Sequence, residues 1–136
     1  MKLSRKRILF FTAILVFLVV MICTTAYLKS VADYQKAVKE TTLSSIDIST
    51  VPDGVYIGEY DVDFVYAKVE VTVQDKAITK IEILEHKNGR GKSAESIVDK
   101  IIEKQNIDVD AVSGATNSST VLKKAVENAL LPHENF

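Results

Sequence analysis

The sequence VYAKVEVTV, residues 65–73, alternates small or aliphatic residues with polar or aromatic ones along its whole length. Successive side chains of a β-strand point to opposite faces, so this period of two predicts a strand with one buried face. A polar break, QDK at residues 74–76, separates it from AITKIEIL at residues 77–84, which is again rich in β-branched residues. Two such stretches joined by a short polar break predict an antiparallel hairpin.

Segments on both sides of the hairpin complete a small domain. Residues 55–60, VYIGEY, predict a third short strand. Downstream, apolar residues recur at helical spacing in a segment capped by Ser93 and in a second segment over residues 118–130. The pattern predicts an α+β fold, in which two amphipathic helices pack on a small antiparallel sheet. On the second helix, the residues expected to face solvent are Lys123, Lys124, Glu127 and Asn128.

Residues 85–92, EHKNGRGK, join the hairpin to the first of these helices and have the composition of an exposed loop. The chain has one Cys and two His residues, His86 and His133, so it cannot build a disulfide framework or a Cys-based metal site. No combination of acid, base and nucleophile suggests a catalytic triad. Any cofactor is therefore expected to be held by other groups.

Residues 8–28 form a run of 21 residues without a charged side chain. A helix rises about 1.5 Å per residue, so this run can cross a hydrocarbon core of about 30 Å. Residues 1–7 precede it and contain four basic residues and no acidic one. The positive-inside rule keeps such a segment in the cytoplasm. The sequence therefore predicts a single-pass protein of the cell membrane whose C-terminal domain is extracytoplasmic.

A cleavable signal peptide is the main alternative to this anchor, because Thr24-Thr25-Ala26 resembles a small-residue cleavage site. The apolar core of a signal peptide has about 7 to 15 residues, and the run in this chain is longer. A lipoprotein is disfavoured, because Ile22 is larger than the residue that normally precedes a lipidated cysteine such as Cys23. We therefore favour an uncleaved signal-anchor.

The stretch that follows the anchor, residues 29–51, predicts a juxtamembrane helix to about Leu43 and then a linker rich in Ser, Thr and Asp. The domain itself is expected over residues 52–136, after a boundary near Ser49. All 18 acidic residues follow the apolar run, whereas four of the 17 basic residues precede it. The resulting negative charge of the domain argues against nucleic acid as a partner.

The sequence DAVSGATNSS, residues 110–119, lies directly before the last predicted helix. The first N–H groups of a helix lack intrahelical partners and lie at the positive end of its dipole, so this segment can bind phosphate. The alternative is that a Ser or Thr merely caps the helix, which contributes about 1 kcal/mol and requires no ligand. The segment places Gly114 and Ala115 among five side chains with oxygen, which are Ser113, Thr116, Asn117, Ser118 and Ser119.

The string DAVSGAT, residues 110–116, resembles the flavinylation motif of the FMN-binding domain family. This family includes the flavin-bearing C subunit of the sodium-translocating NADH:quinone oxidoreductase, the G subunit of Rnf complexes and small membrane-anchored proteins. The resemblance extends over about residues 52–131, because residues 53–59 resemble the opening strand of these domains and residues 69–84 resemble their hairpin. After His86 the family often has Glu-Thr-Pro-Gly, where this chain has Lys-Asn-Gly-Arg-Gly.

The resemblance implies that Thr116 carries FMN through a phosphoester bond, attached from FAD by a Mg²⁺-dependent flavin transferase. Asp110 would help the transferase to recognise or deprotonate this site, or is simply a turn residue. His86 would lie near the flavin and tune its electronics, or is a polar residue at a strand end. The groups expected around the FMN phosphate are Ser113, Gly114, Ala115, Asn117 and Ser118.

The implied function is that of a membrane-anchored, extracytoplasmic flavoprotein that relays electrons between membrane redox partners. No nicotinamide-binding motif is visible, so an electron-transfer role is expected rather than that of a free-standing enzyme. Two alternatives are a noncovalent FMN-dependent reductase and a cofactor-free interaction module of the cell envelope. Aromatic residues that can stack on a flavin, or serve only in packing, are Tyr56, Tyr60, Phe64 and Tyr66.

Overall fold

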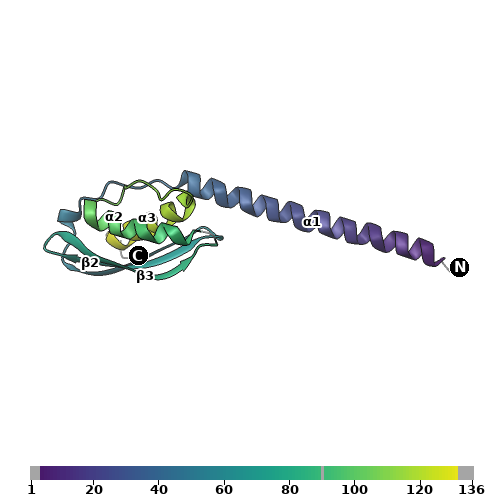
Figure 1. Ribbon diagram of the computed structural model, residues 1–136, viewed down its shortest axis with the longest axis horizontal. Helices are drawn as coiled ribbons and strands as arrows, with labels where there is room; N and C mark the ends of the chain where they lie inside the picture. The colour runs from purple at the N-terminus through teal and green to yellow at the C-terminus, as the bar shows by residue number, and fades with distance from the viewer. Residues whose placement is uncertain (1–3, 90, 132–136) are drawn as a thin grey trace. The chain divides into compact units, whose positions relative to one another are not determined.

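The computed structural model describes residues 4–89 and 91–131 (Figure 1). His133 and the last residues of the expected domain lie outside this range, as do the first three residues of the basic N-terminus. The chain divides into two compact units, and the second begins at Gln35. Each unit is described by itself.

The first unit consists of most of helix α1, which runs over Arg5–Glu40. This helix is long and apolar enough to cross a membrane, and its most apolar window has no residue buried in the protein. Large apolar side chains such as Phe17 and Ile22 are about two-thirds exposed. The helix therefore confirms the candidate membrane span, and residues 29–40 of the predicted juxtamembrane helix are continuous with it.

The sheet of the second unit has three antiparallel strands in the order β1-β2-β3. They are β1 (Gly54–Asp61), β2 (Tyr66–Gln74) and β3 (Ala77–Lys87). Asp75 and Lys76 form the turn between β2 and β3, and both have positive φ. Two-residue turns of this kind match the right-handed twist of the flanking strands, which makes a tight hairpin possible. The predicted hairpin is confirmed.

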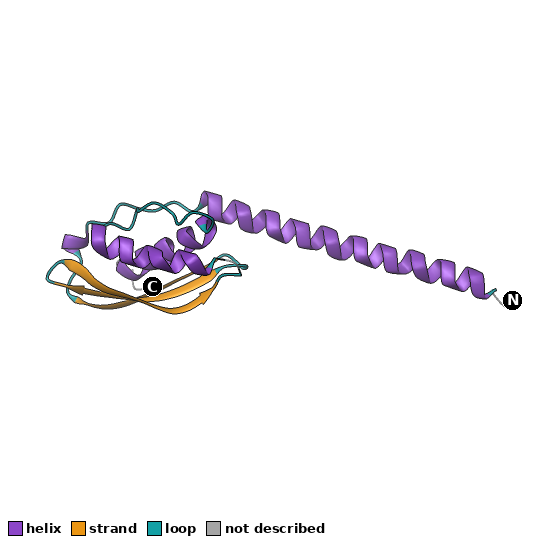
Figure 2. Ribbon diagram, in the orientation of Figure 1, coloured by secondary structure: helices purple, strands orange, loops and turns teal. Residues whose placement is uncertain are grey.

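Helices cover one face of this sheet, as Figure 2 shows. They are the 3-10 helix η2 (Lys92–Ser96), α2 (Ile97–Lys104) and α3 (Thr116–Leu130). Helix α3 packs against β1 and β2, and α2 packs against β3. The expected α+β fold is therefore confirmed. The core between the layers includes the fully buried side chains of Val69, Val71, Ile78, Ile97, Ile101, Val121, Leu122 and Val126.

Three local predictions about this domain are wrong. Strand β3 continues through His86 to Lys87, so the predicted exposed loop over 85–92 begins later than expected. Ser93 lies inside η2 and does not cap a helix. Helix α3 begins at Thr116 with Ala115 at its N-cap position and no side-chain cap bond, so no Ser or Thr caps it.

Residues 41–51, expected to contain a linker, pack against the domain instead of extending freely. They include the short 3-10 helix η1 (Ile48–Thr50), and the side chains of Ile48 and Val51 are buried. The backbone N–H of Ser44 donates to Glu127 Oε1 over 3.2 Å. Lys124 Nζ donates to the carbonyl oxygen of Thr42 over 3.0 Å. The compact unit accordingly begins before the boundary expected near Ser49.

Helix α3 comes very close to the sheet at Gly58 of β1. A Cβ at this position would overlap the backbone of Ala125 and Ala129 in α3. Backbone atoms cannot move aside as a flexible side chain can, so any larger residue must separate the helix from the strand.

We expect Gly58→Ala to lower the free energy of unfolding by about 3 kcal/mol, because the added methyl overpacks this contact. Urea unfolding of the detergent-solubilised chain, followed by circular dichroism, measures the change. Gly54→Ala is the matched control, since its Cβ would lie 3.4 Å from the nearest atoms, which belong to the side chain of Tyr56. Equal stabilities of the two variants would contradict the close approach at Gly58.

Candidate functional site

A tight turn presents the start of α3 to solvent. The N–H of Ala115 donates to the carbonyl oxygen of Val112 over 3.0 Å, which closes the turn through Ser113 and Gly114. Gly114 has a φ of 78°, and a Cβ there would meet nothing within 4 Å. Glycine is thus required here by the backbone conformation alone. Thr116 follows as the first residue of α3, and it is exposed.

The other side chains of this segment differ in burial. Asp110 and Ser113 are exposed, Asn117 is half-buried, and Ser118 is 3% exposed. Ser118 lies beneath the loop after β3, because a Cβ on Gly91 would overlap its side chain. The structure therefore places Asp110, Ser113 and Thr116 at the surface, whereas Ser118 packs below it.

The start of α3 is electrostatically suited to an anion. Its first turn contains no acidic residue, so no carboxylate of its own offsets the positive end of the helix dipole. The N–H groups of Thr116, Asn117 and Ser118 belong to the first turn, where a helix supplies no backbone acceptors. These groups and the exposed hydroxyl of Thr116 lie on one short segment, which can accommodate a phosphate.

His86 is buried on the strand side of the loop that covers Ser118. Its side chain is 2% exposed, and Nδ1 lies 3.1 Å from Glu95 Oε1. The side-chain amide of Asn88 is 3.3 Å from the same nitrogen. Nε2 is buried and has no hydrogen-bond partner among the residues that the structure describes. His86 is thus an oriented imidazole with one unsatisfied nitrogen near the loop that packs on α3.

Sequence reasoning missed the roles of two charged residues on this side of the domain. Lys123 was expected to face solvent, but it is 9% exposed and donates to the carbonyl oxygen of Val109 over 2.9 Å. Glu95 pairs with the imidazole of His86. The expectation for Glu127 is also wrong, because its side chain is fully buried. The sequence did contain a sign that Lys123 faces the segment before α3. Lys123 follows Ser119 by four residues, so the two side chains lie on the same face of the helix.

The Tyr residues considered for flavin stacking form bonds within the domain. The hydroxyl of Tyr56 donates to the carbonyl oxygen of Pro52, and that of Tyr60 lies 2.9 Å from Thr41 Oγ1. Tyr66 donates to Glu59 over 2.8 Å, and this bond to a carboxylate raises the pKa of Tyr66 to about 12. None of these bonds involves the segment that leads into α3.

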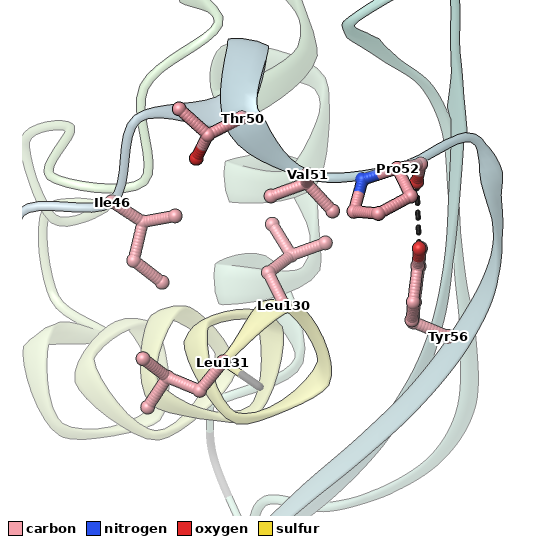
Figure 3. A pocket seen from close by; sticks show the side chains of 7 residues that line it. All are labelled: Ile46, Thr50, Val51, Pro52, Tyr56, Leu130 and Leu131. Atoms are coloured by element: carbon pink, nitrogen blue, oxygen red, sulfur yellow. Dashed lines mark hydrogen bonds between the residues drawn. The ribbon is translucent and has the colours of Figure 1, made fainter. Parts of the chain in front are cut away.

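An apolar pocket of about 390 Å³ lies at the other end of α3 (Figure 3). Leu130, which lines it, follows Thr116 by 14 residues, or about 21 Å along a helix. Apart from Tyr56, which was considered for flavin stacking, the pocket is lined by none of the predicted site residues, and it is separate from the turn before α3. Its lining residues are Ile46, Thr50, Val51, Pro52, Tyr56, Leu130 and Leu131.

Comparison with known proteins identifies the domain. Residues 66–131 match the family model of the FMN-binding domain. This part of the chain belongs to the FMN-binding domain family. The match contains β2, β3, η2, α2, α3 and the whole segment 110–119, so the resemblance found in the sequence is confirmed. Searches of curated proteins and of solved structures found no match.

The FMN-binding domain holds no recognisable metal centre in the part of the chain described. Among residues 4–89 and 91–131, no three His, Cys, Asp or Glu side chains are grouped so that they could hold a metal ion. Independently of any metal, the N–H groups and polar side chains at the start of α3 are groups that could hold a phosphate. These groups fit a phosphate ester because they combine donors with an accessible hydroxyl.

The positive φ of Gly114 leads to a prediction about the turn. Replacing Gly114 by Ala should lower the free energy of unfolding by about 1 to 2 kcal/mol, because a Cβ is strained in the left-handed region. Gly114→Asn should cost less, since Asn tolerates this region better. Thermal unfolding of both variants measures the difference. An Ala variant as stable as the parent would show that the turn does not need this conformation.

Proposed function

We propose that this chain is a membrane-anchored, extracytoplasmic flavoprotein that carries FMN covalently on Thr116 and relays electrons. The FMN-binding domain and the apolar N-terminal helix support the combination of flavin and membrane. Covalent attachment is supported mainly by Thr116, which is exposed at the first position of α3, directly after the turn that contains Gly114. At this place a hydroxyl is accessible to a second protein and adjoins a phosphate-binding helix end.

Attachment requires a donor of the FMN unit, for which FAD on a Mg²⁺-dependent flavin transferase is suitable. Thr116 Oγ1 attacks the phosphorus of the FMN half of FAD and forms a phosphoester bond. The phosphoanhydride bond breaks, AMP leaves, and the hydroxyl proton passes to a base. Thr116 is thus an acceptor of modification, and no electrons are exchanged in this step. Asp110, exposed six residues earlier, would be recognised by the transferase or accept the proton.

The N–H groups of the first turn of α3 would hold the phosphate of the attached FMN. Ser113 and Asn117 can add side-chain donors at the edge of this site, and Ser118 supports it from below. Gly114 and Ala115 leave room for close approach of the backbone. His86 would contribute its unsatisfied Nε2 on the side of the covering loop. Bound FMN supplies one- or two-electron transfer, while these residues set its orientation and potential.

Electron relay at a membrane suits this arrangement. A covalent bond retains the flavin outside the cell, where a dissociating cofactor would diffuse away. Residues 8–28 would span the bilayer and residues 1–7 would lie in the cytoplasm, which leaves the domain beside membrane redox partners that deliver and remove electrons. An electron carrier needs both an electron donor and an electron acceptor, so we expect this protein to act with at least two such partners.

Intact mass of the full chain, coexpressed with a flavin transferase and extracted in detergent, tests the attachment. The parent should gain the mass of one FMN less one water, and Thr116→Val should gain none. Thr120→Val is the matched control and should be loaded like the parent, because the Thr120 hydroxyl is bonded to the carbonyl oxygen of Thr116 within α3.

Each other outcome supports a different function. Bound FMN without a change in mass would overturn covalent attachment and favour a noncovalent FMN-dependent reductase. A colourless, unmodified parent, with the transferase active on another substrate, would favour a cofactor-free envelope module. Loading of the Thr116→Val variant would assign the bond to another hydroxyl, which peptide mapping would locate.

The proposed topology can be measured with a single cysteine. In a Cys23→Ser background, which removes the only Cys of the chain, Lys104→Cys places a thiol at an exposed position of the domain. We expect a membrane-impermeant maleimide to label this thiol in intact spheroplasts. Ser4→Cys is the control and should react only after lysis. Labelling in the reverse order would place the domain in the cytoplasm.

A further inference from the structure

We infer that Ser119 and Lys123 are positioning residues that hold residues 108–112 against α3 and thereby present Thr116 to the flavin transferase. The inference rests on the proposed attachment of FMN and concerns how the acceptor is made accessible. Neither residue touches the reacting hydroxyl. Both act on the segment that enters the turn.

The contacts of these two side chains lie on one face of α3. Ser119 is fully buried, and its Oγ accepts a hydrogen bond from the N–H of Val112 over 3.0 Å. One helical turn later, Lys123 Nζ donates to the carbonyl oxygen of Val109 over 2.9 Å and lies 3.5 Å from Asp108 Oδ1. Residues four apart on a helix are neighbours, so the two bonds form one continuous clamp.

The segment held by this clamp has no helix or strand of its own. It follows α2, which ends at Lys104, and precedes α3, which begins at Thr116. Ile107 and Val109 bury their side chains, but its backbone has few bonds within itself. Ser119 and Lys123 fix its path by binding one N–H and one carbonyl oxygen directly before the turn.

A buried lysine is an unusual choice for this position. Burying an ammonium group is costly, and an apolar side chain of similar length would need no partner. The Asp108 carboxylate is largely exposed and only partly compensates for the charge. The bond from Lys123 to the Val109 carbonyl is therefore better explained by control of the segment's position than by stability.

Hydrogen bonds in the turn connect the clamped segment to Thr116, the proposed acceptor of FMN. Val112 contributes its N–H to Ser119 and its carbonyl oxygen to the N–H of Ala115. The carbonyl oxygen of Ala115 in turn accepts from the N–H of Ser119 over 2.9 Å. Ser119 thus closes a ring of bonds around Ser113 and Gly114. Removing the Ser119 hydroxyl breaks the bond that ties the turn to α3 through Val112, while Thr116 stays chemically intact.

The rate of FMN transfer to the full chain, measured by intact mass with purified transferase, FAD and Mg²⁺, tests the clamp. Thr and Val have nearly the same shape, and a methyl group of Val stands where Thr has its hydroxyl, so Ser119→Thr and Ser119→Val add similar bulk and differ in the hydrogen bond. We expect the Val variant to be loaded at least about tenfold more slowly than the Thr variant. Lys123→Met should slow loading similarly, mainly through kcat because the acceptor surface is unchanged.

Lys124→Met is the matched control for charge. It removes the neighbouring lysine, whose bonds go to Thr42 and Glu127 and not to residues 108–112, and it should be loaded at the parent rate. Hydrogen exchange gives a readout without flavin. The amide of Val112 should exchange about tenfold faster in Ser119→Val than in Ser119→Thr, with the amides of β2 unchanged.

The possible failures are distinguishable. Folded Ser119→Val and Lys123→Met variants that are loaded as fast as the parent would overturn the clamp and leave covalent attachment standing. Equal slowing by Lys124→Met would also overturn it, because charge would then be the cause. A parent that is never loaded would overturn the proposed attachment and this inference with it.

Discussion

The contact between α3 and β1 at Gly58 is the constraint on which the rest of the domain depends. Without a side chain there, the backbone of Ala125 and Ala129 can lie directly on the strand. The apolar faces of β2 and α3 then close into a core that includes Val69 and Leu122. Because this contact fixes the helix on the sheet, it also fixes where the first residue of α3 meets solvent. The candidate attachment site is therefore a consequence of core packing.

The same helix carries the polar groups that organise the surrounding chain. Ser119, Lys123 and Glu127 are all buried, and each bonds to a segment outside the helix. Buried polar groups need partners, since desolvation without a bond costs free energy. Two irregular segments of the domain, one before the site and one before β1, are thus held on α3. Although its sequence pattern is simply amphipathic, α3 thus binds both of these segments through buried polar side chains.

Much of the fold, and the place of the candidate acceptor Thr116 near a helix start, could be predicted from local sequence. The alternation in residues 65–73 predicted β2, and the polar break after it predicted the hairpin, because strand periodicity and turn chemistry act over a few residues. The segment 110–119 stood out by composition and by its place before a helix. The burial of Lys123 and Glu127 was not predictable in this way. Their partners Val109 and Ser44 lie 14 and 83 residues away in sequence.

The sequence by itself determined the strands, the apolar span and the position of Thr116 near a helix start, because each is set by short-range pattern. The tertiary structure alone decided which polar residues are buried. It placed His86 beside Glu95 beneath the helix layer and Ser118 beneath Gly91. The periodicity of a helix or strand shows which side chains share one face, but it does not show which other segment that face contacts. That depends on packing between segments that the chain brings together only when it folds.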